Sequence, residues 1–271
     1  MEENPELIQS GQNVDDMKFR AAPVFLIHDG GGTTFAYHCL NPLGRPTYGI
    51  FNPHFRTGGK FEGGVRGMGR LYAGIIRRSC SESSFPAERN SDGSVNILLG
   101  GWSMGGLLSL EIAKVLTGDH GVRIIGILMV DSIYPVHLAT EHVASFDRNH
   151  LDLSLSKNMY LSLKAMKEAV RLILDWDPPI WAGDEVSERP PISLLRAMES
   201  LPTASAQGHL IDIYRHDQSL GWHNYDNNMF LEIVDVEGNH FEVFSFQHIP
   251  GISRAIKRCF DELERVGHAI Y

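Results

Sequence analysis

The sequence contains few of the features that mark disulfide-rich, metal-binding and membrane proteins. Its 271 residues include only three cysteines, Cys39, Cys80 and Cys259. They are isolated, without a CxxC pair or a Cys/His ligand spacing, so we expect neither a disulfide framework nor a zinc or other metal site. No apolar run is long enough to span a bilayer, which argues against a membrane protein.

Positive charge is also scarce. The chain carries 24 Lys and Arg against 33 Asp and Glu, a formal net charge of −9. Nucleic-acid binding depends on clustered cations that meet phosphates, so this balance argues against a nucleic-acid-binding protein. The first 19 residues are acidic and polar, opposite to the basic and then apolar order of a secretory signal. We therefore expect a cytoplasmic location.

What the sequence does contain is an alternation of strand-like and helix-like patterns. Short apolar runs bounded by turn residues predict buried strands at 22–29, 47–51, 95–99 and 123–131. Stretches with helical spacing of apolar residues lie between them. Strands that alternate with helices predict an α/β fold, with a mostly parallel sheet covered by helices on both faces. The length fits one domain over residues 1–271.

The alternation is interrupted in the second half of the chain. Residues 156–174 have the spacing of an amphipathic helix, and the next strand candidate is 209–214. We therefore expect a mainly helical insertion, a lid, over residues 137–205. The strand pattern returns at 230–244, and 252–266 predicts a closing helix.

A glycine-rich serine motif joins the third strand candidate to a helix. The stretch "VNILLGGWSMGGLLSLEIAKVL" contains GxSxG, a weak pattern alone but typical of a nucleophile elbow in a strand–turn–helix setting. Side chains two positions before and after the serine would collide with such a turn, which accounts for Gly101 and Gly105. The helix behind Ser103 directs free N–H groups toward a developing oxyanion. The pattern predicts Ser103 as a nucleophile.

A serine nucleophile needs a histidine base and an acid that orients the histidine. His240 is the candidate base, because it follows the last strand pattern in the turn "VEGNHFEVF". Two acids are candidates, Asp131 at the end of "RIIGILMVD" and Asp217 after "HLIDIYRH", and the residues alone leave both open. Asp235 is weaker, because it would lie inside the last strand.

The turn "HDGGG" at 28–32 follows the first strand candidate, at the position that supplies an oxyanion donor in α/β-hydrolases. We expect one donor from the backbone N–H of Met104 and the second from Gly30 or Gly31. His28 is a candidate to position the substrate beside this turn. A dinucleotide site is disfavoured, because "GGGTTF" lacks the third glycine of GxGxxG.

These motifs carry a family resemblance. The pieces "PVFLIHDGGGTTFAY", "GGWSMGGLLSLEIA", "GILMVDSIYP" and "VEGNHFEVF" resemble, in order, the thioesterase domains of polyketide synthases and nonribosomal peptide synthetases, especially fungal ones. The resemblance runs from about residue 20 to the C-terminus and implies an α/β-hydrolase fold. In that family the catalytic aspartate stands in a "VDS" or "IDS" setting, which implies Asp131 rather than Asp217 as the acid.

The resemblance also implies an activity. It is the release of a polyketide or peptidyl chain from a carrier-protein phosphopantetheine thioester, through an acyl-serine intermediate, by hydrolysis or cyclisation. The implied partner is an acyl or peptidyl carrier protein, and no bound cofactor is implied. Claisen-cyclising fungal members have a "PDGSGSA"-like turn and "GWSAGG", from which this chain departs, so carbon–carbon bond formation is less favoured.

Three tryptophans are candidates for contact with the acyl chain. Trp102 precedes the serine, and Trp176 and Trp181 lie in the expected insertion, where they either line an acyl pocket or pack the insertion onto the core. Three other functions stay open. They are a free-standing serine esterase or lipase, an acyltransferase to an external acceptor, and a ligand receptor without turnover on the same scaffold.

Overall fold

The computed structural model describes residues 3–11, 21–135, 156–202 and 209–270. These residues form a sheet of seven strands in the order β1-β3-β2-β4-β5-β6-β7, in which β1 is antiparallel to β3 and all other neighbours are parallel. The strands are β1 Glu6–Gln9, β2 Val24–Ile27, β3 Thr47–Ile50, β4 Val95–Trp102, β5 Val122–Val130, β6 Ile192–Glu199 and β7 Glu232–Asn239.

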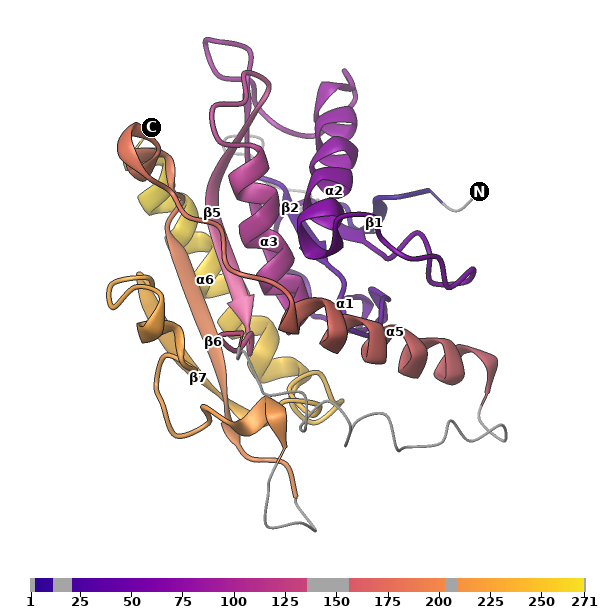
Figure 1. Cartoon of the computed structure of the whole chain (residues 1–271). Helices are drawn as coiled ribbons and strands as arrows, with labels where there is room; N and C mark the ends of the chain where they lie inside the picture. Colours follow the sequence, from indigo (N-terminus) through magenta and orange to yellow (C-terminus); the bar gives the residue numbers. More distant parts are fainter. Residues whose placement is uncertain (1–2, 12–20, 136–155, 203–208, 271) are drawn as a thin grey trace.

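Helices cover both faces of this sheet. α2 and α3 lie on one face and α6 on the other (Figure 1). The helices are α1 Phe35–His38, α2 Gly64–Ser81, α3 Met104–Val115, α5 Lys157–Leu174 and α6 Ile249–Ile270, with short 3₁₀ turns η1 Gly183–Glu188, η2 Leu210–Asp212 and η3 Trp222–Asn224. The predicted α/β fold is confirmed. Among the described residues, no helix combines the length and apolarity that a membrane crossing requires.

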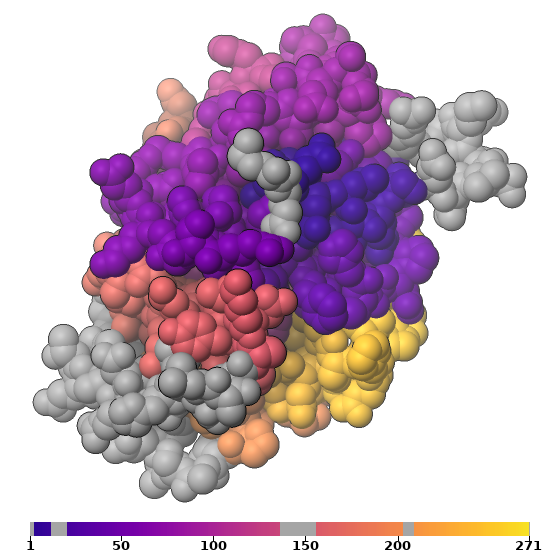
Figure 2. Space-filling view, turned by 90° about the vertical axis from the view of Figure 1, so that its right-hand side faces the viewer, coloured from indigo at the N-terminus to yellow at the C-terminus, as the bar shows by residue number. Residues whose placement is uncertain are grey.

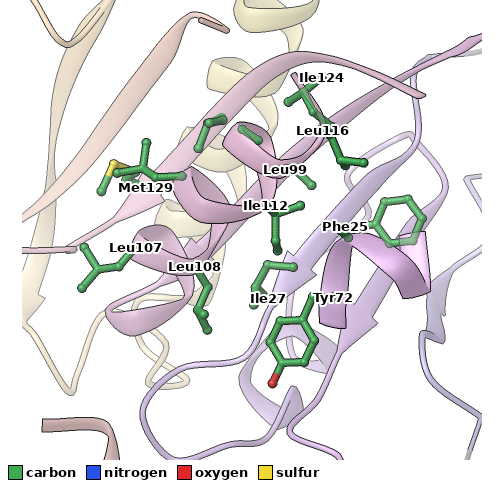
Figure 3. Close-up of a cluster of buried hydrophobic side chains, with 14 of the residues drawn as sticks. Phe25, Ile27, Tyr72, Leu99, Leu107, Leu108, Ile112, Leu116, Ile124 and Met129 are labelled. Atoms are coloured by element: carbon green, nitrogen blue, oxygen red, sulfur yellow. The ribbon is translucent and has the colours of Figure 1, made fainter. Parts of the chain in front are cut away.

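The central strands are buried on both sides, which explains their continuous apolar runs. All four residues of β2 are buried, as are the seven residues of β5 from Ile124 to Val130. One core cluster joins the sheet to α2 and α3 (Figure 3), and a second joins its other face to α1 and α6. Labelled members of the first are Phe25, Ile27, Tyr72, Leu99, Leu108 and Ile112.

Strand order brings the ends of three strands together. β2 pairs with β3 on one side and β4 on the other, so the chain changes direction across the sheet between β3 and β4. In such open sheets the crevice at the carboxyl ends of the strands at this switch point is the usual ligand site. Ile27 pairs with Gly101, and Trp102 pairs with Val130. The residues that follow β2, β4 and β5 therefore meet at one edge.

The expected insertion is corrected by the structure. Residues 192–199 form β6 between β5 and β7, so the non-sheet segment ends before Ile192 rather than at 205. Conversely, 209–214 is not a strand but contains the 3₁₀ turn η2. Short apolar runs fit a strand and a helical turn equally well, and only pairing with neighbours decides between them. The predicted helix at 156–174 is confirmed as α5, whereas residues 137–155 of the expected lid lie outside the described part.

Candidate active site

Ser103 stands at a sharp turn between β4 and α3. Its φ of 57° and ψ of −119° lie outside the regions that a non-glycine residue adopts freely. The turn is held on both sides, because the Ser103 N–H donates to the Val130 carbonyl at 2.8 Å and the Ser103 carbonyl accepts from the Ser132 hydroxyl at 2.7 Å. This is the backbone geometry of a nucleophile elbow.

The glycines on either side of Ser103 permit this turn. A Cβ atom on Gly101 would lie 2.4 Å from the carbonyl carbon of Gly105. A Cβ on Gly105 would lie 2.3 Å from the Ile27 carbonyl oxygen. Both contacts are far inside van der Waals range, and both are with backbone that cannot swing away. The predicted steric role of these two glycines is confirmed.

Asp131 and His240 form a buried pair next to the turn. Asp131 follows β5 directly, with a φ of 45°, and its Oδ2 lies 2.7 Å from Nδ1 of His240, which follows β7. The two side chains are 0% and 3% exposed. The His240 ring lies 5.4 Å from the Trp102 ring, centroid to centroid. Three strand ends thus bring together residues separated by more than a hundred positions.

The other candidate acids have different partners. The Asp217 carboxylate accepts from the backbone N–H groups of Ser219 and Gly221 and lies 2.8 Å from Nδ1 of His223, so it stabilises its own turn. Asp235 pairs with Arg196 across β7 and β6 at 2.7 Å, with 44% of its side chain exposed. The structure thus places Asp131 beside His240, as the family resemblance implied.

Arg215, which the sequence reasoning did not single out, contacts the same aspartate. Its guanidinium lies 2.6 Å from Oδ1 and 2.8 Å from Oδ2 of Asp131. Burial opposes ionisation of Asp131, but hydrogen bonds from His240 and Arg215 outweigh it and hold the pKa of the carboxyl at about 2. Arg215 directly follows the strand candidate 209–214, and no local pattern around it indicates a role for its side chain.

The turn after β2 lies beside Ser103. The Gly31 N–H donates to the Asp29 carboxylate at 3.0 Å, and Gly30 and Met104 line the same cavity as Ser103. Asp29 lines it too, and burial raises the pKa of its carboxyl to about 6. The predicted oxyanion residues are therefore grouped around the serine, with an ionisable side chain among them.

His28 is buried behind this turn. Its Nε2 lies 2.7 Å from the Tyr72 hydroxyl, and its Nδ1 lies 2.6 Å from the Asp29 carbonyl oxygen. Desolvation lowers the pKa of His28 to about 4, so the ring is neutral at neutral pH. It lines a second cavity of about 370 Å³ rather than the cavity at Ser103. The structure gives His28 a part in supporting the turn.

The cavity at Ser103 is enclosed on one side by α5. Its volume is about 180 Å³, and Ser103, His240 and Trp102 line it together. The α5 residues that form its wall are Met166, Ala169, Val170, Ile173 and Leu174. Ala169 and Val170 also border the second cavity, which lies between α5 and the connection from β3 to α2. Figure 2 shows these two segments side by side on this face.

Trp176 and Trp181 pack elsewhere. The Trp176 indole N–H donates to the Glu111 carboxylate at 2.5 Å, and the Trp181 indole N–H donates to the Thr117 hydroxyl at 3.2 Å. Both rings belong to the core on the α3 side, and neither is among the described residues that line the cavity at Ser103. Of the two roles that the sequence left open, the structure fits packing of this segment onto the core.

Two further features bear on the chemistry of the site. Within the described ranges, no group of three or more His, Cys, Asp and Glu side chains is arranged to hold a metal ion. The ionisable side chains at the cavity are Asp29, Tyr134 and His240, while Asp131 stands behind the histidine. The cavity thus brings together a hydroxyl, an imidazole backed by a buried carboxylate, and the start of a helix.

No protein-family model matches the sequence, but individual proteins of known sequence and structure do. The chain is 31% identical over 267 residues to a probable thioesterase of Botryotinia fuckeliana, covering 97% of this chain and 92% of the relative. It is 29% identical over 296 residues to a nonribosomal peptide synthetase of Aspergillus flavus, covering 98% of this chain and 8% of the synthetase.

A solved structure shares the fold. The NocB thioesterase domain, in covalent complex with a fluorophosphonate nocardicin G analogue, superposes with a TM-score of 0.62 and 22% identity. The match covers 88% of this chain and 94% of that chain. The relative from Botryotinia fuckeliana matches over nearly its full length. The chain therefore belongs to the thioesterase family, on an α/β-hydrolase fold.

Proposed function

We propose that the protein releases an acyl chain, polyketide or peptidyl, from the phosphopantetheine thioester of a carrier protein, with Ser103, His240 and Asp131 as its catalytic triad. The observation that carries the proposal is the buried pair of His240 and Asp131, 2.7 Å apart, whose histidine lines the cavity of a strained serine. Family membership supports the thioesterase reaction, and the synthetase relative supports a carrier-bound substrate.

The geometry supports one path for the proton. His240 is held by Asp131 through Nδ1, which leaves Nε2 for the Ser103 hydroxyl. As the Ser103 oxygen bonds to the thioester carbonyl carbon, its proton passes to Nε2. The carbon–sulfur bond then breaks, and the departing thiolate takes this proton. Asp131 remains ionised throughout and stabilises the imidazolium.

The oxyanion of the tetrahedral intermediate is assigned to two backbone N–H groups. Met104 begins α3, so its N–H is among those that a helix leaves unpaired at its start. Gly30 is the better second donor, because the N–H of Gly31 is already bonded to Asp29. Donors held in place before the reaction stabilise the developing charge without reorganisation.

The acyl-serine is resolved by a second nucleophile. Water, or a hydroxyl or amine of the chain, attacks the ester carbonyl while His240 takes its proton, and the Ser103 oxygen leaves with that proton. Hydrolysis and cyclisation use the same residues. The mostly apolar lining of the cavity supports a hydrophobic acyl group next to the carbonyl. The carrier protein is the proposed partner, and the triad itself calls for no cofactor.

The first test is acylation of the purified protein with a panel of acyl-pantetheine thioesters, followed by intact mass and by analysis of released products. We expect a mass increase in the wild type that is absent in Ser103→Ala. Asp131→Asn should lower the acylation rate by about 10³–10⁴-fold, because the wrong histidine tautomer is held. The matched control is Asp217→Asn, which removes the other candidate acid and should acylate at nearly the wild-type rate.

Other outcomes separate the alternative functions. Cleavage of small oxygen esters with no acylation by any thioester favours an esterase. Release that requires an added alcohol or amine favours an acyltransferase. If Asp217→Asn stops acylation and Asp131→Asn does not, the proposed triad is wrong.

A further inference from the structure

Arg215 is a buried arginine whose hydrogen-bonding capacity is fully used. It lies in the connection between β6 and β7, with 2% of its side chain exposed. Its Nε donates to Asp212, its Nη1 to Asp131 and the Ala197 carbonyl, and its Nη2 to Asp131 and the Ile211 carbonyl. A guanidinium has five N–H groups, and each has an acceptor here. Such a side chain has one orientation.

The contact leaves the Asp131 carboxylate no freedom. Its Oδ1 accepts from Arg215 at 2.6 Å and from the Ala197 N–H at 2.9 Å, while its Oδ2 accepts from Arg215 at 2.8 Å and lies 2.7 Å from His240 Nδ1. A planar fork that binds both oxygens sets the plane of the carboxylate as well as its position. His240 is aligned through that plane.

Charge is the second consequence of the contact. Asp131 is 0% exposed, and a buried carboxylate facing only a neutral imidazole is strongly disfavoured. Arg215 compensates the negative charge in the resting protein. Arg215 and His240 contact the same Oδ2 atom, so the positive charge of Arg215 lies close to the imidazole.

We propose that Arg215 is a positioning residue of the thioesterase triad, which holds the Asp131 carboxylate in the plane of His240 and balances its charge so that the imidazole stays free to accept the serine proton. This inference rests on the proposed function. Arg215 would thus be a fourth residue of the hydrogen-bonded site. It is supplied by the connection between β6 and β7 and not by a residue at the end of a strand.

The charged groups that face His240 come from three elements. Asp131 follows β5, Arg215 acts through it from the turn after η2, and Asp29 interacts electrostatically with His240 from the turn after β2. Burial raises the pKa of the Asp29 carboxyl to about 6, so this carboxyl changes its charge within the pH range of the test. Each measurement below is therefore repeated in the Asp29→Asn background, which removes that change of charge.

The test follows the reaction of Ser103 with an alkyl fluorophosphonate as a function of pH, by intact mass. In this reaction the serine oxygen bonds to phosphorus, fluoride leaves, and the hydroxyl proton passes to His240. We expect Arg215→Gln to react at least about 10-fold more slowly and the midpoint of its acidic limb to move up by about one pH unit, since a nearby cation has been removed. Arg215→Lys should keep the wild-type midpoint but react more slowly, because an ammonium lacks the fork.

Arg45 provides the matched control. It is an equally buried arginine, 1% exposed, that pairs with Asp261 and Glu264 of α6. Arg45→Gln should lower the melting temperature and leave the midpoint unchanged. If the Arg215→Gln midpoint equals that of the wild type, Arg215 only stabilises the fold and the proposal is overturned.

Two further outcomes are distinct. If Arg215→Gln does not fold, Arg215→Lys decides: reduced labelling at a retained melting temperature supports the proposal, and wild-type labelling overturns it. If wild type and Ser103→Ala are labelled alike, the proposed function fails, and the role of Arg215 fails with it.

Discussion

Among single residues, two neighbours at the end of β2, His28 and Asp29, have pKa values that burial shifts in opposite directions. Burial lowers the pKa of His28 to about 4 and raises that of Asp29 to about 6. The stability that His28 contributes is therefore complete above pH 6.5 and is lost as the pH falls through 4. The contribution of Asp29 is complete below pH 3.8 and is lost as the pH rises through 6. The two dependences offset each other between about pH 4 and 6.

Substituting Asp29 should reveal the pH dependence of stability that comes from His28. Asp29→Asn keeps an acceptor for the Gly31 N–H but removes the buried charge. We expect its free energy of unfolding to exceed that of the wild type by up to about 3 kcal/mol at pH 7.5, at about 1.4 kcal/mol per pKa unit, and by only about 0.5 kcal/mol at pH 4.

Urea unfolding at a series of pH values, followed by tryptophan fluorescence, measures this difference. A gap between the two proteins that stays constant from pH 4 to 7.5 would contradict the raised pKa of Asp29. A carboxylate that destabilises the folded protein at neutral pH, in the cavity of Ser103, is consistent with a role in binding or catalysis rather than in folding.

At the scale of elements, the elbow depends on close approach between α3 and the end of β2. Gly105→Ala places a Cβ atom 2.3 Å from the Ile27 carbonyl oxygen and 2.9 Å from that of His28. We expect a loss of about 3 kcal/mol or more and no acylation of Ser103, because both obstacles are backbone atoms. The checks are thermal unfolding and intact mass after thioester treatment.

Gly251 is the control for that substitution. It also lies in a helix, α6, but a Cβ atom there meets nothing within 4 Å. Gly251→Ala should therefore be neutral or stabilise the protein by up to about 1 kcal/mol, as expected when alanine replaces glycine in a helix. Equal losses in the two variants would mean that helix propensity, and not the contact with β2, governs the effect at Gly105.

At the scale of the whole molecule, the site is a space between the edge of the sheet and α5. Ile173 lines this space from α5. Ile173→Trp should reduce acylation by long acyl thioesters about 10-fold relative to short ones, because it removes volume next to the serine. On the same helix, Met159 is 54% exposed, so Met159→Trp should leave the ratio of acylation by long thioesters to acylation by short ones unchanged.

Competition between long and short acyl-pantetheines measures this ratio. An equal fall in acylation by both lengths in Ile173→Trp would argue against α5 as the wall of the acyl site.

Most strands and helices of the fold could be predicted from local sequence patterns. The strands β2, β3, β4, β5 and β7 and the helices α2, α3, α5 and α6 were predicted because their apolar spacing repeats within a few residues. The turn at Ser103 was predicted because GxSxG is a local pattern, although the atoms that exclude a side chain at Gly105 belong to Ile27 and His28, far away in the sequence. The short run at 192–199 was missed, because nothing local separates a buried strand from a buried helical turn.

The local sequence pattern was enough to predict the turn at Ser103 and the strands that end beside it, because apolar spacing and glycine placement repeat over a few residues. The contacts in the folded chain identify the acid beside His240, since Asp131 follows β5 and lies 2.7 Å from the ring, whereas Asp217 lies in a turn and contacts His223. Tertiary structure also decided that Trp176 packs against α3 and that Arg215 holds the aspartate. These last choices depend on atoms brought together from 65 to 109 residues apart, and no local pattern records them.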